Sequence, residues 1–258
     1  MLSVSGLIGN RMRDTEKITI GICSPGHVST PFMTAILDIA RSQRQLGQFI
    51  SLQGSGVISR LRNQICSTFL DKTKDDWLLM IDTDEVLTID GFKKLVAAAD
   101  AKSRQIISGV VHGAWEVEGA IYPEPVPCIF RRGESGGLYS VHEYDDDQVI
   151  EIDAAGTGCL LVHRRVLERF RNEADPVHQG KDWGFFQDMP LGGQWVGEDL
   201  LFCLRAVSFG YKIWAHTGVQ LTHERRYWLS KEHHQDFRRF NLPRHHSPDK
   251  DHVDVSSN

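Results

Sequence analysis

Carboxylate side chains gather where an apolar run ends in the segment DDWLLMIDTDEVL, residues 75–87. The run Trp77–Ile81 is followed at once by three acids within four positions, the last of them Glu85. Carboxylates packed this closely repel one another and raise each other's pKa unless a cation lies among them. A divalent cation with carboxylate and water ligands removes that conflict and leaves room for phosphate oxygens. The D-x-D pair Asp82 and Asp84 therefore predicts metal chemistry, with a solvated or helix-capping acidic cluster as the alternative interpretation.

Two further groups of residues that could take part in a reaction lie later in the chain. Each also has a purely structural explanation. VGEDLLF places Glu198 and Asp199 at the start of an expected helix, where the helix dipole favours acids by a few tenths to about 1 kcal/mol. VQLTHE places His223 at the end of a short expected strand, and a lone histidine is more often structural than a metal ligand. The ordered combination of D-x-D, E-D and histidine carries more weight than any one of them.

The first half of the chain alternates β-branched runs with segments of helical apolar spacing. Such alternation predicts an α/β fold with a mainly parallel, Rossmann-like sheet and helices on both faces. Because ligands of open sheets lie beyond the carboxyl ends of strands, CSPG and DTDE are placed at a binding edge. We expect strands within 17–25, 47–54, 76–82 and 104–111, and helices from Thr30, at 57–71 and at 90–101, the last with Asp90 as N-cap.

The second half of the sequence changes character. Residues 111–150 predict irregular hairpins and loops, and GTGCLLVHRRVLERF, residues 156–170, predicts a strand followed by a helix. Residues 171–196 form a long loop, and loops of this length are usually functional or disordered. We expect its aromatic residues to close over a substrate or supply a binding platform, with a surface loop that packs its own aromatics as the alternative; they are Trp183, Phe185, Phe186 and Trp195. GEDLLFCLRAVSFG, residues 197–210, predicts a helix with an apolar face of Leu200, Leu204 and Val207, and short strands are expected at 211–216 and 219–224.

The composition is that of an ordinary globular protein of 258 residues, with 41% hydrophobic and 24% charged residues. A net charge of −5 provides no overall basic field for nucleic acid or anionic lipid. The five cysteines are scattered without a CxxC pair, which predicts reduced thiols rather than a disulfide framework or a zinc site. No apolar stretch approaches about 18 residues, so we expect neither a membrane span nor a signal peptide, and we predict a cytoplasmic location.

Six blocks follow one another in a specific order and spacing: ITIGICSP, SRLRNQICSTFL, DDWLLMIDTDEVL, GTGCLLVHRRVLE, GEDLLFCLRAVSFGYKIW and LTHE. In that order they resemble the metal-dependent glycosyltransferases of the GT-A fold, in particular the large inverting family-two group and its bacterial or phage relatives. The resemblance extends roughly from Ile18 to Trp228. It implies one GT-A domain at 17–243, with a nucleotide-binding half at 17–110 and an acceptor half at 111–243, between flexible segments at 1–16 and 244–258.

The resemblance also implies roles for individual residues. Asp84 matches the D-x-D carboxylate that binds Mn²⁺ or Mg²⁺, and His223 matches the downstream metal ligand. Carboxylate, imidazole and diphosphate oxygen together favour Mn²⁺. Asp199, with Glu198 beside it in the E-D motif, matches the catalytic base. Ser24, Pro25, Arg62 and Asp82 match residues on the nucleotide or donor side. We also expect Thr83 and Arg226 on the donor side, with a solvated surface arginine as the alternative for Arg226. On the acceptor side we expect Gly158 and Trp195, with a strand bulge and a loop that packs its own aromatics as the respective alternatives.

The reaction implied by the resemblance moves a sugar from a nucleoside-diphosphate sugar, with UDP-hexose as the expected donor, to the hydroxyl of a glycan, a protein or a modified nucleobase. Inversion with Asp199 as general base is expected, and retention is the open competitor. MIDTDEVL also fits the hhhDxDx[TV] motif of haloacid-dehalogenase-type phosphatases with Asp82 as nucleophile, although that motif normally closes a first strand. A nucleotidyltransferase and a non-catalytic sugar-nucleotide-binding protein are two more candidate functions.

Overall fold

The structure is a computed structural model, and the chain divides into two compact units. The first comprises residues 1–114 and 125–224, and the second comprises residues 115–124 and 225–258. The predicted flexible tail at 244–258, and residues 1–11 of the predicted flexible start, lie outside the described residues. The described residues are 12–54, 56–116, 123–134, 137–173, 184–191, 194–226, 230–233 and 235.

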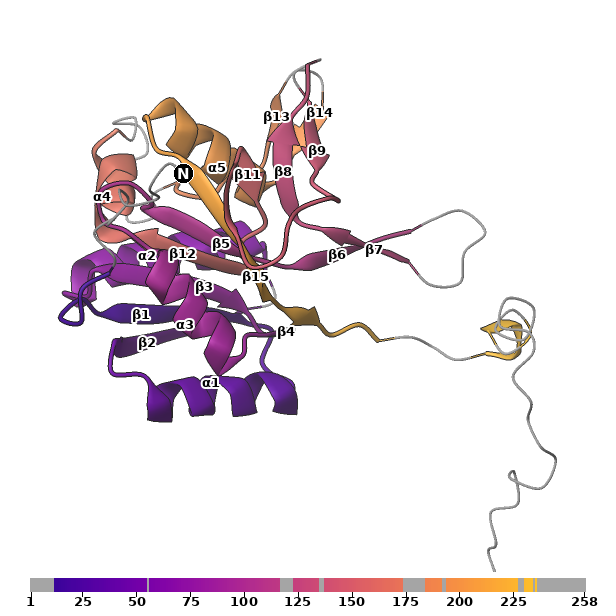
Figure 1. The fold of residues 1–258 in the computed structure, drawn as a ribbon, viewed down its shortest axis with the longest axis horizontal. Helices are drawn as coiled ribbons and strands as arrows, with labels where there is room; N and C mark the ends of the chain where they lie inside the picture. The colour runs from indigo at the N-terminus through magenta and orange to yellow at the C-terminus, as the bar shows by residue number, and fades with distance from the viewer. Residues whose placement is uncertain are drawn as a thin grey trace, which may run out of the picture. The chain divides into compact units, whose positions relative to one another are not determined.

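A seven-stranded sheet runs through the first unit in the order β10-β15-β5-β12-β3-β1-β2 (Figure 1). The pairs β1–β2, β1–β3 and β15–β5 are parallel, whereas β12 is antiparallel to both neighbours and β10 is antiparallel to β15. Five strands therefore share one direction, and the predicted mainly parallel sheet is confirmed. The strands are β1 (Ile18–Ser24), β2 (Leu46–Gln53), β3 (Trp77–Asp82), β5 (Ile106–Val110), β10 (Val149–Ile152), β12 (Cys159–His163) and β15 (Ile213–Gln220).

Helices cover both faces of this sheet, as predicted (Figure 1). Strand β3 shows why its run is apolar without alternation. Leu78 and Met80 pack into the core layer under α2, α4 and α5, whereas Leu79 and Ile81 pack into the layer under α1 and α3. Both faces of the strand are thus removed from water. The helices are α1 (Thr30–Ser42), α2 (Ile58–Lys72), α3 (Ile89–Ala98), α4 (Arg164–Asn172) and α5 (Glu198–Ser208).

Short strands form small accessory sheets around the acidic edge and in the second half of the chain. The predicted irregular hairpins of residues 111–150 correspond to several of these strands. The accessory sheets are β4 (Glu85–Val86) with β16 (Thr222–His223), β6 (His112–Trp115) with β7 (Glu124–Pro127), β8 (Ile129–Arg132) with β9 (Leu138–Ser140) and β11 (Ala154–Ala155), and β13 (Met189–Leu191) with β14 (Gln194–Val196).

The N-cap predicted for the third helix is wrong. Helix α3 begins at Ile89, and Thr88 is its N-cap, since Thr88 Oγ1 accepts a hydrogen bond of 3.0 Å from Gly91 N. Asp90 lies in the first turn instead, where its carboxylate pairs with Lys94 at 3.3 Å. Threonine and aspartate are both favourable N-caps, so the choice between Thr88 and Asp90, two positions apart, depends on where the backbone enters the helix.

The predicted apolar face of the last helix is also wrong. Helix α5 buries Leu201, Phe202, Cys203 and Ala206, whereas Val207 is 40% exposed. Phe202 decides the orientation, because its ring stacks on the rings of Phe170 and Phe186 at centroid distances of 4.8 and 4.6 Å. Apolar residues occur on two sides of this helix, and only tertiary packing selects between them.

Two strands are present where two were expected, at 211–216 and 219–224, but the break between them lies at Leu221. Strand β15 continues through Thr217 and Gly218 to Gln220, and β16 (Thr222–His223) begins after Leu221. Thr217 stays in the strand because its amide donates to Gln148 O at 2.8 Å and its hydroxyl donates to Asp145 O at 2.7 Å. In the part of the chain that the structure describes, no helix combines the length and apolar character needed to cross a membrane.

Candidate functional site

A cluster of two carboxylates and one imidazole forms beyond the end of β3. The chain makes a turn after Asp82 and enters β4, which pairs antiparallel with β16. In this pairing Glu85 lies directly opposite His223. The amide of Glu224 donates to the carbonyl oxygen of Asp84 at 2.7 Å and holds the turn against β16. One possible ligand atom from each of Asp84, Glu85 and His223 lies within 4.8 Å of the others.

The ring of His223 is held at both nitrogens. Its Nε2 lies 3.1 Å from Asp84 Oδ2, and its Nδ1 lies 2.7 Å from the carbonyl oxygen of His112 and 3.2 Å from Glu85 Oε1. The hydrogen bond with Asp84 is the main cause that raises the pKa of His223, and burial opposes it. An imidazole between acidic groups favours a positive charge, either a proton or a cation, at this point.

The donor set of this cluster fits a divalent cation. Carboxylate oxygen and imidazole nitrogen together suit Mn²⁺ and similar ions. The Asp84 side chain is 48% exposed, so a cation bound to it stays accessible to a second ligand from solution. The sequence indicated Asp84 and His223 but missed Glu85 as a member of the cluster, although Glu85 was one of the three acids that ended the apolar run.

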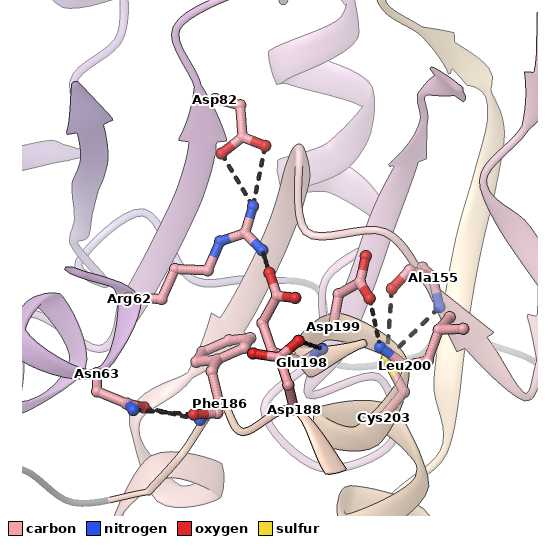
Figure 2. A network of polar contacts seen from close by, with 10 residues as sticks. All are labelled: Arg62, Asn63, Asp82, Ala155, Phe186, Asp188, Glu198, Asp199, Leu200 and Cys203. Atoms are coloured by element: carbon pink, nitrogen blue, oxygen red, sulfur yellow. Dashed lines mark hydrogen bonds and ion pairs between the residues drawn. The ribbon is translucent and has the colours of Figure 1, made fainter. Parts of the chain in front are cut away.

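A second network, centred on Arg62, lies at the same strand end (Figure 2). Arg62 projects from α2, is 4% exposed, and lies between the carboxylates of Asp82 and Glu198. Its Nη2 donates to both Asp82 oxygens at 3.1 and 2.9 Å, and its Nη1 donates to Glu198 Oε1. Burial disfavours the guanidinium cation, but the charges of Asp82 and Glu198 outweigh burial and raise the pKa of Arg62.

Asp199 stands beside Glu198 at the start of α5 but makes different contacts (Figure 2). Its Oδ1 accepts a hydrogen bond of 2.7 Å from Leu200 N, and its Oδ2 faces Gly156. Burial raises the pKa of both Asp199 and Glu198, and the charge of Arg62 opposes that shift in each. Asp188 serves this helix start as well, because its Oδ1 accepts from Glu198 N at 3.2 Å.

The turn Gly156–Gly158 connects the two groups of acids. A Cβ atom on Gly156 would lie 3.7 Å from Asp199 Oδ2, and one on Gly158 would lie 3.4 Å from Glu85 Oε1. The carbonyl oxygen of Gly158 also accepts from Asp82 N at 3.2 Å. The turn that precedes β12 therefore has Asp199 near its first residue and the carboxylate–imidazole cluster near its last.

The residues predicted to line the nucleotide lie at the neighbouring strand end. Cys23 of β1 pairs with Asp82 of β3, so Ser24 and Pro25 follow at the same edge of the sheet. Ser24 Oγ accepts from Gly26 N at 3.1 Å, and Gly26 adopts a φ of +106°, which is strained for residues with a side chain. This turn keeps the exposed Pro25 at the sheet edge.

The aromatic loop separates into buried and exposed parts. Phe185 and Phe186 are each 1% exposed and belong to the core, so the prediction that they close over a substrate is wrong for these two rings. Asn63 of α2 fixes their segment, since its side chain exchanges hydrogen bonds of 2.9 and 2.7 Å with the backbone of Phe186 (Figure 2). Trp195 on β14 is 71% exposed and remains available for contact, and Trp183 lies outside the described residues.

Thr83 and Arg226 are the two remaining residues predicted to bind the donor. Thr83 lies in the turn between β3 and β4 and is 8% exposed, so its side chain is largely covered by the protein. Arg226 belongs to the second compact unit, and its role stays a prediction.

Comparison with known proteins identifies the fold. No protein-family model and no curated protein matches the sequence. Among solved structures, A197 from STIV superposes with a TM-score of 0.53 at 16% identity, over 81% of this chain and 86% of that one. GalNAc-T7, crystallised with UDP, GalNAc and Mn²⁺, superposes with a TM-score of 0.51 at 12% identity, over 86% of this chain and 48% of that one. The chain thus spans about half of GalNAc-T7, and it has the fold of the GT-A glycosyltransferases.

Proposed function

We propose that the chain is a metal-dependent glycosyltransferase that moves a hexose from a UDP-hexose to an acceptor hydroxyl with inversion. The observation that carries the proposal is the turn Gly156–Gly158, which has Asp199 at one end and the cluster of Glu85, Asp84 and His223 at the other. Transfer of a sugar from a diphosphate to a hydroxyl needs a base that accepts the hydroxyl proton and a cation that stabilises the departing diphosphate. A carboxylate and a candidate cation site on either end of one turn could supply both. The UDP and Mn²⁺ bound to the structurally similar GalNAc-T7 support this choice of donor and metal.

Asp84 and His223 are the residues that would hold Mn²⁺ or Mg²⁺, through Asp84 Oδ2 and His223 Nε2. Those two atoms share a proton when the imidazole is charged, and a cation would replace that proton. When bound, the cation supplies Lewis-acid stabilisation for the negative charge on the departing diphosphate. Asp84 is the more exposed of the two ligands, so we assign the donor to its open side.

Arg62 prepares the donor side of the site by fixing Asp82. Both oxygens of Asp82 accept from Nη2 of Arg62, which fixes the orientation of that carboxylate at the end of β3. We assign Asp82 to the ribose or sugar hydroxyls, with Thr83 presenting backbone groups beside it. Ser24 and Pro25, at the end of the neighbouring strand β1, would line the base. Arg226 is assigned to the diphosphate because it follows closely after His223 in the sequence.

Asp199 is the residue that would accept the proton of the attacking hydroxyl. Burial raises its pKa, which makes its carboxylate a stronger base, and its Oδ2 is directed toward the Gly156 turn. Glu198 is tied up by its ion pair with Arg62, so we assign it to positioning α5 rather than to proton transfer. Gly158 and the exposed Trp195 remain the proposed acceptor-side residues, with Trp195 as a platform for a sugar or another flat group.

The test is a screen for UDP release from a panel of UDP-sugars, with Mn²⁺ and with EDTA. We expect release from a UDP-hexose with Mn²⁺, its loss in Asp84→Asn and His223→Ala, and a decrease of about 10²–10⁴-fold in Asp199→Asn with donor binding retained. Metal-independent release, or phosphate release from a simple phosphomonoester, would refute the proposal. The anomeric configuration of the product, measured by NMR, decides between inversion and retention.

A further inference from the structure

Glu85 is a deeply buried acid to which the proposed reaction assigns no individual role. Its side chain is 2% exposed, whereas that of Asp84, the adjacent residue, is 48% exposed. Burial of a carboxylate is unfavourable unless hydrogen-bonding or charged partners compensate for the lost water. The pairing of β4 with β16 places His223 directly opposite Glu85, so the partner is supplied by the sheet register itself.

The contacts of His223 assign its hydrogen to one nitrogen. A carbonyl oxygen can only accept, so the carbonyl oxygen of His112, at 2.7 Å from Nδ1, favours the tautomer with hydrogen on Nδ1. Glu85 Oε1, at 3.2 Å from the same nitrogen, is a second acceptor for that hydrogen. At the other nitrogen, Asp84 Oδ2 at 3.1 Å competes for the hydrogen of a neutral ring. One carbonyl and one carboxylate at Nδ1 thus oppose one carboxylate at Nε2.

We infer that Glu85 is a positioning residue that decides this competition: it keeps the hydrogen of His223 on Nδ1 and turns the Nε2 lone pair toward Asp84. The inference rests on the proposed function insofar as the lone pair is there to receive a metal cation. Metal-binding histidines generally donate their second nitrogen to a carboxylate or a carbonyl, which fixes the ring and makes the other nitrogen more basic. His223 has both kinds of acceptor.

Direct metal binding by Glu85 is the competing role, and the geometry argues against it. Glu85 Oε1 contacts Nδ1, and the two nitrogens of an imidazole point away from different edges of the ring. The exposed Asp84, not the buried Glu85, lies at the nitrogen that would face the cation.

The experiment compares the wild-type chain with Glu85→Gln, Glu85→Leu and the control Glu151→Gln, an exposed acid paired with Lys212 at the surface. Nitrogen NMR of the metal-free chain, at a pH where imidazole is neutral, reports which nitrogen of His223 carries hydrogen. Calorimetric titration with MnCl₂ reports cation affinity. Circular dichroism confirms that each variant is folded.

We expect the Nδ1–H form in wild type and Glu151→Gln, and a clear gain of the Nε2–H form in Glu85→Leu with a loss of about 10–100-fold in Mn²⁺ affinity. Glu85→Gln, whose amide oxygen still accepts, should keep the Nδ1–H form and lose less affinity than Glu85→Leu. An unchanged tautomer in Glu85→Leu overturns the inference, and so does complete loss of Mn²⁺ binding in Glu85→Gln, because that result makes Glu85 a ligand. If wild type binds no Mn²⁺, the proposed function fails while the tautomer comparison still decides the role of Glu85.

Discussion

Replacement of Arg62 should lower the free energy of unfolding of the chain by about 3 kcal/mol. The Arg62→Met variant removes the cation that lies between Asp82 and Glu198, whose side chains are only 27% and 12% exposed. Loss of one partner from a buried ion pair typically costs about 3–5 kcal/mol, because the remaining charges keep their desolvation without compensation. The partial exposure of Asp82 lets water screen its share, so we expect the lower end, about 3 kcal/mol.

That magnitude is large relative to a total stability of about 5–15 kcal/mol. For a chain of this size it corresponds to a decrease in Tm of about 6–12 °C. Urea unfolding followed by circular dichroism measures the free energy directly, provided that the transition is two-state. Arg60→Met is the matched control, because Arg60 is an exposed residue of the same helix, and its loss should change stability by less than about 0.5 kcal/mol.

The second variant separates charge from packing. In Arg62→Met with Glu198→Gln, the more buried of the two remaining carboxylates is neutral, so part of the lost stability should return. If Arg62→Met unfolds at the same urea concentration as wild type, or if adding Glu198→Gln lowers stability further, the network is not held by the balance of charge around Arg62. Loss of volume alone would leave both variants equally destabilised.

Two further outcomes follow from the neighbouring groups. Burial raises the pKa of Asp199, so the folded chain keeps the carboxyl proton to a higher pH than the unfolded chain does. The contribution of Asp199 to the free energy of unfolding therefore falls as the pH rises from about 3.9, the unfolded pKa, to the raised pKa of the folded chain. Asp199→Asn should therefore gain stability relative to wild type as pH rises above about 4, measured by urea unfolding at several pH values, and a pH-independent difference would contradict this. Gly158→Ala should reduce transferase activity by about tenfold with little change in fold, because a misplaced group near the reaction can cost up to about 10²-fold. The added methyl would lie 3.3 Å from Val111 Cγ2 and 3.4 Å from Glu85 Oε1, so it would shift its neighbours slightly. Gly210→Ala, with open space around its Cβ but a φ of +88°, should instead lower stability and leave activity unchanged.

The alternation of strands and helices was predictable because it depends on local periodicity. The continuous apolar run of β3 follows from a strand covered on both faces, and the pattern is visible without any tertiary information. The burial of Leu201 and Phe202, with Leu200 and Leu204 only partly buried, was not predictable, since two apolar stripes compete on α5. Only the Phe170 and Phe186 rings, which come from distant segments, select one of them.

The candidate site was predictable where residues resemble a motif, and not where they depend on register. Asp84 and His223 were indicated by the order of the blocks, and the structure brings their side chains to 3.1 Å. Glu85 acquires its partner only through the antiparallel pairing of β4 with β16, which the sequence does not encode locally. The contact of Arg62 with Glu198 likewise joins positions 136 residues apart, so neither residue alone indicates the other.

The role of each acid at this strand end follows from what neutralises it. Glu85 is buried and has the imidazole of His223 as its partner, and Glu198 is nearly buried and has Arg62. Asp82 is partly exposed and shares Arg62 with Glu198. Asp84 is the most exposed, and its contact with Nε2 raises the pKa of His223, so this pair favours a positive charge. These carboxylates can therefore lie together beyond the end of one apolar strand, because Glu198 has the guanidinium of Arg62 and Glu85 has the imidazole of His223 as a partner, and we propose that the exposed Asp84 binds a cation from solution.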